Sequence, residues 1–168
     1  MGDTVLTTTR LNIRRIGPDD FEAMMSVYAD LALMRYVGDS SAITAEDCAR
    51  WIDITLANYA KRGYGLFLME SVEDGSLAGF IGLTHPGGQP EPEVKYVLRQ
   101  GLWGQGLATE AVSELCRHAR SAWGLTDVIA TVASENTASH RVLAKCGFVK
   151  SEELVEADGS TTVVWRLA

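Results

Sequence analysis

Residues 101–110 read Gly101-Leu102-Trp103-Gly104-Gln105-Gly106-Leu107-Ala108-Thr109-Glu110. This stretch joins an alternating, strand-like segment to a helical pattern of apolar residues. Glycine adopts backbone conformations that let consecutive N–H groups face one centre, and the first N–H groups of a helix have no partner inside it. The stretch therefore predicts a phosphate or diphosphate site without a cationic side chain. A glycine-rich turn that only caps the helix is the simpler alternative.

Two common nucleotide motifs do not fit this turn. A P-loop ends in Gly-Lys-Ser/Thr, whereas Leu107 and Ala108 follow the last glycine here. A dinucleotide fingerprint that starts at Gly104 needs Gly or Ala at position 109, which is Thr109. That motif also needs an acid at the end of the next strand, but Asp127 precedes it.

Outward from the turn, the pattern predicts one mixed α/β domain over residues 1–168. Strands are expected at residues 6–16, 66–69, 77–83, 94–99, 128–132, 148–155 and 161–167. Helices are expected at residues 18–31, 44–62, 107–123 and 137–146. Leu31 is expected on the apolar stripe of the first helix. The apolar positions expected along the second helix are Trp51, Ile54, Leu56 and Tyr59.

The composition narrows the class of protein. With 168 residues, 46% hydrophobic and 22% charged, the chain is long and apolar enough to fold around a core. The net charge of −7 disfavours nucleic acid as a partner and suits a cationic acceptor. No run approaches the ~20 apolar residues that span a bilayer, so no membrane role is expected.

The cysteines and the N-terminus predict a compartment. Cys48, Cys116 and Cys146 form no CxxC pair, so neither a disulfide framework nor a metal site is expected. The first residues lack the charged start and apolar core of a signal peptide. Both features favour the reducing cytoplasm.

Two separated motifs resemble the GNAT superfamily of N-acetyltransferases, and most closely its ribosomal-protein alanine N-acetyltransferase branch. Residues 103–111 resemble the branch's coenzyme loop, W-G-x-G-x-A-T-E-A, and Asn136 to Ser139 with Gly147-Phe148 resemble its N-x-x-S…G-F element. The opening residues 6–15 also fit. The resemblance implies an α+β fold: a mixed, mostly antiparallel sheet of about seven strands, flanking helices and a splayed central strand pair. Homodimers are common among the proteins it resembles.

The resemblance further implies acetyl-CoA as co-substrate, without a metal, and direct acetyl transfer to a primary amine in a ternary complex. The amine belongs to a protein N-terminus or to a small molecule. A non-catalytic acyl-CoA sensor is the alternative. The coenzyme-binding residues it implies are Gly104, Gln105, Gly106, Leu107, Ala108 and Thr109 for the diphosphate, main chain at Val97, Leu98 and Arg99 for the pantetheine amides, and Asn136. Asn136 could instead only cap its helix.

The resemblance also implies catalytic and acceptor residues. Glu93 occupies the general-base position, unless it is only a solvent-exposed acid at a strand start, and His85 is the other candidate base and acceptor contact. Many GNAT enzymes place a tyrosine seven residues after the asparagine, but Leu143 stands there. The branch resemblance puts Ser139 near the sulfur instead, unless it is a helix-surface serine. Cys146 is read as a core residue, and the acceptor wall is expected to include Tyr36, Asp39 and Trp51.

Overall fold

The computed structural model describes residues 2–35 and 41–168, and its strands form one sheet in the order β1-β2-β3-β4-β5-β6-β8-β7. The strands are β1 (Thr4–Thr7), β2 (Leu11–Arg15), β3 (Leu66–Ser71), β4 (Leu77–Thr84), β5 (Glu93–Leu98), β6 (Ile129–Ala133), β7 (Phe148–Val155) and β8 (Thr161–Leu167). The α-helices of the described residues are α1 (Phe21–Tyr28), α2 (Ala45–Arg62), α3 (Leu107–Trp123) and α4 (Thr137–Lys145). Short 3-10 turns lie at Pro18–Asp20, Pro86–Gly88 and Gln100–Leu102.

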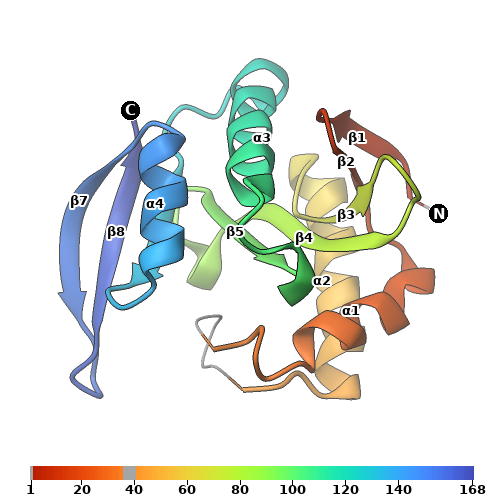
Figure 1. The fold of residues 1–168 in the computed structure, drawn as a ribbon, viewed down its shortest axis with the longest axis horizontal. Coiled ribbons are helices and arrows are strands. Elements are labelled where there is room, and N and C mark those ends of the chain that lie inside the picture. The colour runs from red at the N-terminus through yellow and green to blue at the C-terminus, as the bar shows by residue number, and fades with distance from the viewer. Residues whose placement is uncertain (1, 36–40) are drawn as a thin grey trace.

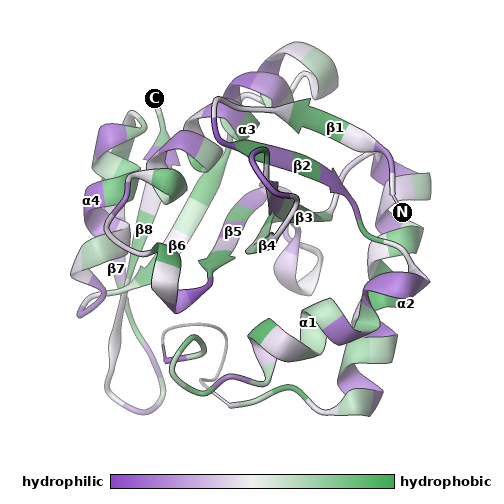
Figure 2. Ribbon diagram, turned by 45° about the vertical axis from the view of Figure 1, so that its right-hand side comes forward, coloured by the Kyte–Doolittle hydropathy of each residue, from purple (hydrophilic) through white to green (hydrophobic). Residues whose placement is uncertain are grey.

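The expected fold class is confirmed: the sheet is mixed and mostly antiparallel, with helices around it. In Figure 1, α4, β7 and β8 lie together at one end, α1 and α2 at the other, and α3 between them. Two hydrophobic clusters hold these layers. The larger one packs α3 and α4 on the sheet, and the smaller one packs α1 and the first part of α2. Figure 2 shows apolar and polar residues alternating along these helices, which is the pattern of helices with one buried face.

The first expected strand is in fact a hairpin, which raises the strand number to eight. β1 and β2 pair antiparallel, and the chain turns at residues 8–10. The amide of Thr8 donates to the Leu11 carbonyl (2.7 Å), and the Leu11 amide donates to Thr8 Oγ1 (3.0 Å). The β-branched residues 7–9 resembled a strand interior, but the hydroxyl of Thr8 bonds the backbone and makes a turn.

Both expected helical stripes were wrong in part. α1 ends at Tyr28, and Leu31 beyond it is 65% exposed. The Asp30 carboxylate accepts from the Ala32 amide (3.0 Å), a turn that replaces the next helical hydrogen bond. On α2, the large apolar side chains of Ile54 and Leu56 are exposed. The buried positions are Cys48, Ile52, Thr55 and Tyr59.

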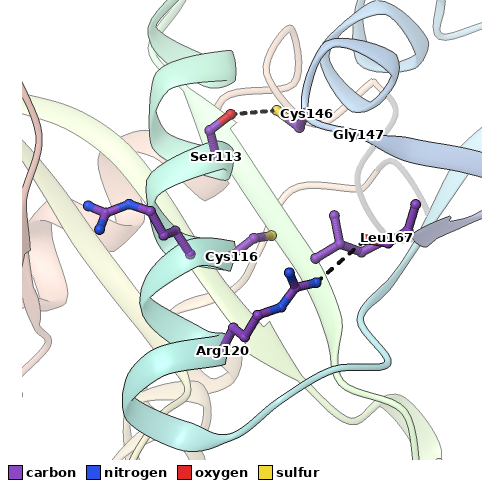
Figure 3. A pocket seen from close by; sticks show the side chains of 8 residues that line it. Ser113, Cys116, Arg120, Cys146, Gly147 and Leu167 are labelled. Atoms are coloured by element: carbon purple, nitrogen blue, oxygen red, sulfur yellow. Dashed lines mark hydrogen bonds between the residues drawn. The ribbon is translucent and has the colours of Figure 1, made fainter.

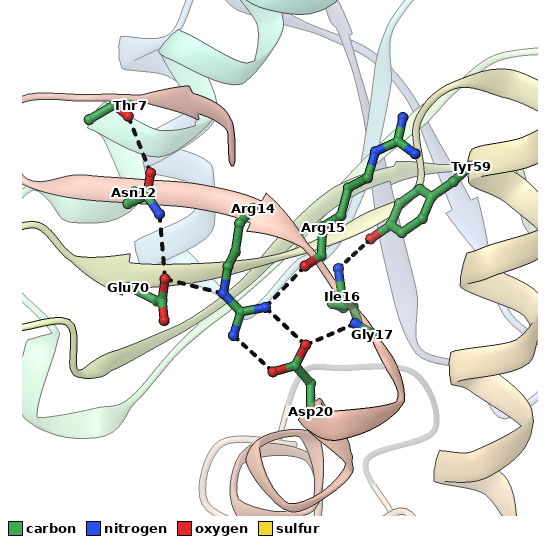
Figure 4. A network of polar contacts seen from close by, with 9 residues as sticks. All are labelled: Thr7, Asn12, Arg14, Arg15, Ile16, Gly17, Asp20, Tyr59 and Glu70. Atoms are coloured by element: carbon green, nitrogen blue, oxygen red, sulfur yellow. Dashed lines mark hydrogen bonds and ion pairs between the residues drawn. The ribbon is translucent and has the colours of Figure 1, made fainter. Parts of the chain in front are cut away.

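A buried ion pair fixes α1 to β2 (Figure 4). The Arg14 guanidinium donates to both carboxylate oxygens of Asp20, over 2.9 and 2.8 Å, and its Nε lies 3.2 Å from Glu70. Asp20 also accepts from the Gly17 amide (2.9 Å). The adjacent Ile16 amide donates to the Tyr59 hydroxyl of α2 (2.9 Å), so both helices are tied to this strand.

The central strands part as expected. β5 pairs with β4 from Glu93 to Leu98, whereas its parallel pairing with β6 is limited to Glu93 and Ile129. Parallel neighbours run in the same direction, so the connections that follow β5 and β6 leave the sheet at the same edge. Those connections lead into α3 and α4. The beginnings of both helices therefore lie at the open end of the parted strands.

Candidate functional site

The loop before α3 has the backbone shape expected of an anion cradle. Gly104 and Gly106 have φ angles of 76° and 78°, and Gly106 is the N-cap of α3. This left-handed region favours glycine. A Cβ on Gly104 would meet no atom within 4 Å, and one on Gly106 would meet the Arg10 guanidinium at 3.6 Å. The space in front of Gly104 is therefore open, whereas the space in front of Gly106 is bounded by the Arg10 side chain.

The main-chain amides of this loop have no protein acceptor. Within residues 2–35 and 41–168, none of the N–H groups of residues 104–109 makes a hydrogen bond to a backbone or side-chain atom. Unpaired amides at the start of a helix, where the helix dipole is positive, favour a negatively charged group. The loop therefore offers the main-chain donors that a diphosphate would need.

The N-terminal hairpin clamps this loop from outside. Arg10 donates from Nη1 to the Gln105 carbonyl (2.8 Å) and from Nε to Glu110 in the first turn of α3 (2.8 Å). Glu110 also accepts from the Thr8 hydroxyl (2.6 Å) and the Arg10 amide (2.9 Å). The clamp fixes the end of the loop to the beginning of the helix.

Some main-chain groups just before the loop already have hydrogen-bond partners within the protein. The Arg99 amide donates to the Ala78 carbonyl of β4 (2.9 Å), and the Leu98 carbonyl accepts from the Trp103 indole (3.0 Å). Because main-chain groups alternate in direction along a strand, those of Val97 face β4 with Arg99, and those of Tyr96 and Leu98 face the parted edge. Of the three residues predicted to pair with pantetheine, Leu98 is the one whose main chain faces that edge.

Asn136, Ser139 and Tyr96 form a polar cluster at the parted strands. Asn136 Oδ1 accepts from the Ser139 amide (3.2 Å), so the residue does cap α4. Asn136 Nδ2 donates to Ser139 Oγ (3.1 Å), and the Tyr96 hydroxyl of β5 donates to the same oxygen (2.8 Å). Ser139 is therefore not a free surface serine. Burial raises the pKa of Tyr96 to about 12.

Glu93 lies at the other, closed end of β5. It is 3% exposed, so the alternative of a solvent-exposed acid is wrong. Its carboxylate accepts from the Thr131 hydroxyl (2.9 Å) and from Gln89 Nε2 (3.4 Å), and forms an ion pair with Lys95. Side chains alternate along a strand, so Glu93 and Lys95 face one side of the sheet and Tyr96 the other.

His85 lies at the same closed end. Its Nδ1 is 3.0 Å from the Gln89 carbonyl, and its Nε2 is 2.8 Å from the Tyr64 hydroxyl. A carbonyl only accepts, so Nδ1 carries a proton, and in the neutral imidazole Nε2 then accepts from the tyrosine hydroxyl. The structure links His85 to Glu93 through Gln89, but not to Ser139.

The acceptor wall is only partly described. Tyr36 and Asp39 lie outside the described residues. Trp51 packs edge-on against Tyr28, with ring centroids 5.3 Å apart, which places it in the smaller hydrophobic cluster.

A separate cavity of about 260 Å³ lies between α3, α4 and β8 (Figure 3). Its lining includes Ser113, Cys116, Arg120 and Cys146, and none of the predicted site residues. Ser113 donates to Cys146 Sγ (3.2 Å), and burial raises the pKa of the Cys146 thiol. A partly buried thiol with a raised pKa is a poor nucleophile, which fits the prediction that Cys146 is structural.

The described residues hold neither a cluster of metal-ligand side chains nor a membrane-spanning helix. Residues 2–35 and 41–168 contain no group of three or more His, Cys, Asp or Glu side chains that could hold a metal ion. Among the same residues, no helix is both long and apolar enough to cross a bilayer.

Sequence reasoning missed Arg10, Glu110 and Tyr96. Glu110 belongs to the loop motif and Arg10 to the first expected strand, and neither pattern predicts a contact between them. Tyr96 matched the alternation of a buried strand, and nothing local indicated that its hydroxyl reaches α4. A hydroxyl on an otherwise apolar strand face, beside a gap in the sheet, is the signal that could have found it.

Several known proteins are similar to this chain in sequence. The family model described as "Acetyltransferase (GNAT) domain" matches residues 10–149. The uncharacterized N-acetyltransferase YoaA of Bacillus subtilis (strain 168) is 31% identical over 149 residues, which cover 87% of this chain and 83% of that protein. FsC-acetyl coenzyme A-N(2)-transacetylase of Aspergillus fumigatus is 29% identical over 155 residues, covering 88% of this chain and 66% of that protein.

Solved structures show the same fold. An acetyltransferase from Agrobacterium tumefaciens str. C58 superposes with a TM-score of 0.84 at 26% identity, covering 100% of this chain and 96% of that one. The ribosomal L7/L12 alpha-N-protein acetyltransferase RimL, in complex with coenzyme A, gives a TM-score of 0.82 at 15% identity, covering 98% of this chain and 97% of that one. At that identity the likeness concerns the fold alone.

Proposed function

The chain belongs to the GNAT family of acetyl-CoA-dependent N-acetyltransferases, and we propose that it acetylates a primary amine by direct attack within a ternary complex. The observation that carries this proposal is the row of unpaired amides at residues 104–109, at the open end of the parted strands β5 and β6. The amides bind the diphosphate. The pantetheine enters between the strands, along the edge that Tyr96 and Leu98 face.

The residue that assists departure of the sulfur and the residue that takes the amine proton lie on opposite faces of β5. Ser139, with Asn136, stands on the α4 side and donates a hydrogen bond to the departing sulfur. Glu93, on the other face, accepts the proton of the attacking amine through water. Burial among Thr131, Gln89 and Lys95 keeps this carboxylate in place.

We propose that the acceptor is an α-amine, of a protein N-terminus or of a small molecule. An α-amine of pKa ~8 is ~10% neutral at pH 7, whereas a lysine amine of pKa ~10.4 is charged by more than ~3 pH units. The α-amine therefore needs less help from a base. The net charge of −7 favours the approach of a cationic acceptor, and three unpaired cysteines suit the reducing cytoplasm.

A thiol-release assay over a panel of amines tests this proposal. The panel contains N-terminal peptides, free amino acids, polyamines and lysine side-chain analogues, each with acetyl-CoA. We expect release with at least one α-amine and a product heavier by one acetyl group. Coenzyme A should also raise the melting temperature, because it binds only the folded chain.

A non-catalytic acyl-CoA sensor is the second candidate. It would show the thermal shift without thiol release from any amine, and replacement of Glu93 or Ser139 would not change its coenzyme affinity. No shift at millimolar coenzyme A would contradict both candidates.

A further inference from the structure

We propose that Tyr96 is a positioning residue for acetyl transfer: its phenol fixes Ser139 Oγ so that the serine's own proton points at the coenzyme sulfur. This inference rests on the proposed function. It assigns a role to a residue on β5 rather than on the helix that follows the asparagine, where Leu143 stands.

The first step is the proton count at Ser139 Oγ. A serine hydroxyl has two lone pairs and one proton. Both lone pairs are occupied, by the Tyr96 hydroxyl at 2.8 Å and by Asn136 Nδ2 at 3.1 Å. Since Asn136 Oδ1 must accept from the Ser139 amide, the amide nitrogen of that side chain is the group that faces the hydroxyl.

The second step is the direction of the bond between the two hydroxyls. A phenol is a much stronger acid than an alkyl alcohol and so is the better donor of the pair. With Tyr96 donating, the proton of Ser139 is left over. Among the described residues it has no acceptor, so it is free to donate to a ligand.

The third step is location. Tyr96 lies beyond Glu93, the last position at which β5 pairs with β6, so its side chain crosses the parted strands to reach α4. Ser139 is in the first turn of α4, whose start faces the same open end as the diphosphate loop. The free proton of Ser139 therefore lies where the pantetheine arm ends.

The chemistry balances without a change at Tyr96. The amine nitrogen forms a bond to the acetyl carbon, the carbon–sulfur bond breaks with its electron pair on sulfur, and the amine loses one proton to Glu93 or solvent. Ser139 donates a hydrogen bond to the thiolate and keeps its proton. Tyr96 keeps its own as well, because its pKa of about 12 lies far above the ~8.5 of an ordinary thiol.

Four proteins test the proposal: the wild type, Tyr96→Phe, Ser139→Ala and the double variant. For each, kcat, KM for acetyl-CoA and the dissociation constant of coenzyme A are measured across pH 6–9. Tyr96→Phe should lower kcat about tenfold or more, because it weakens an interaction made chiefly in the transition state. KM and the dissociation constant should stay within about twofold.

The double variant separates positioning from an independent role. If Tyr96 acts through Ser139, the double variant is no slower than Ser139→Ala alone. The plots of kcat against pH should have the same shape in the wild type and in all three variants between pH 6 and 9. Tyr96 stays protonated over this range in the wild type, so its loss removes no titrating group. Tyr59→Phe is the control: it removes another buried phenol, one that bonds Leu66 and Ile16, and should lower the melting temperature without changing kcat.

Three results would overturn the assignment: an unchanged kcat in Tyr96→Phe, losses that multiply in the double variant, or a loss of kcat that parallels a loss of coenzyme affinity. Failure of the proposed function is distinct, since the wild type itself would then release no thiol with any amine.

Discussion

Glu110 binds Arg10 across the gap between the N-terminal hairpin and the long helix, with Arg10 Nε donating to Glu110 Oε1 over 2.8 Å. The same arginine donates to the Gln105 carbonyl, so the loop and the first turn of α3 share one cation. Burial alone would raise the pKa of Glu110. The hydrogen bonds from Thr8 and Arg10 outweigh this effect, so the pKa lies below its ordinary value. The carboxylate is therefore charged at neutral pH and holds the clamp closed.

Replacement of Arg10 by alanine should raise the dissociation constant of coenzyme A about tenfold, or ~1.4 kcal/mol. The loop carbonyl at Gln105 loses its donor, and the amides on either side lose their fixed spacing. Isothermal titration measures the effect. Arg50→Ala is the matched control, because the partner of Arg50 among residues 2–35 and 41–168 is Asp47, on the exposed surface of α2. Equal affinities in the wild type and Arg10→Ala would show that the hairpin does not shape the loop.

A side chain at position 106 should block the coenzyme site that we propose. Gly106→Val adds a branched group at φ 78°, where a Cβ would lie 3.6 Å from the Arg10 guanidinium, in front of the amides. We expect a rise of at least about a hundredfold in the coenzyme dissociation constant, because a side chain blocks approach to the backbone. The thermal shift caused by coenzyme A should disappear with it.

Gly159→Val controls for backbone strain alone. Gly159 has φ 86°, lies in the β7–β8 turn and has open space beside it. Both variants should lose similar stability, about 1 kcal/mol or more, but only Gly106→Val should lose the coenzyme. A similar loss of affinity in both variants would attribute the effect to strain and not to the loop.

The buried pair of Arg14 and Asp20 should make stability depend on pH. The hydrogen bonds from Arg14 hold the pKa of Asp20 below its ordinary value, despite burial. A carboxyl with a lowered folded pKa stabilises the fold above its unfolded pKa of ~3.9, and this contribution is lost as pH falls through the folded pKa. Asp20→Asn removes a negatively charged partner of the buried Arg14 guanidinium, so we expect the free energy of unfolding to fall by about 3–5 kcal/mol at pH 7.

Urea unfolding at several pH values checks this. The difference between wild type and Asp20→Asn should be constant above about pH 5 and should shrink below about pH 4. The neighbouring exposed Asp19, changed to Asn, should alter stability by less than about 0.5 kcal/mol. A difference that stays the same down to pH 3 would mean that the charge of Asp20 contributes nothing.

Local spacing predicted the parts of the site that local structure determines. The glycines of the loop, the start of α3 and the Asn136 cap follow from backbone conformation and hydrogen bonding within a few residues, and each was placed correctly. The clamp was not predictable in this way. Thr8 and Glu110 are far apart in sequence, and nothing near either residue shows that the fold brings them within 2.6 Å.

The burial of Glu93 also depends on distant residues. Its position at a strand start is compatible with an exposed acid, and only the side chains of Thr131 and Gln89, together with Lys95, show that it is enclosed. The expected apolar stripe of α2 was wrong in part because it included exposed residues. Ile54 and Leu56 do not share a helical face with Cys48, Ile52 and Tyr59, and the latter three are the ones that are buried.

Glu93 provides the most direct test of how the amine loses its proton. Glu93→Gln preserves the shape of the side chain and can still accept from Thr131, but it cannot take a proton. A general base contributes typically ~10²–10⁴-fold, so kcat/KM should fall by at least about a hundredfold. The loss should be larger for a lysine-like amine of pKa ~10.4 than for an α-amine of pKa ~8, because the latter is partly neutral without help.

Glu91→Gln, two residues earlier and paired with Arg166 at 4.0 Å, is the matched control and should leave kcat/KM unchanged. Raising the pH should restore activity to Glu93→Gln as solvent takes over deprotonation, and coenzyme affinity should stay at the wild-type value. If the variant instead loses the same factor with every amine at every pH, Glu93 supports the strand and does not accept the proton.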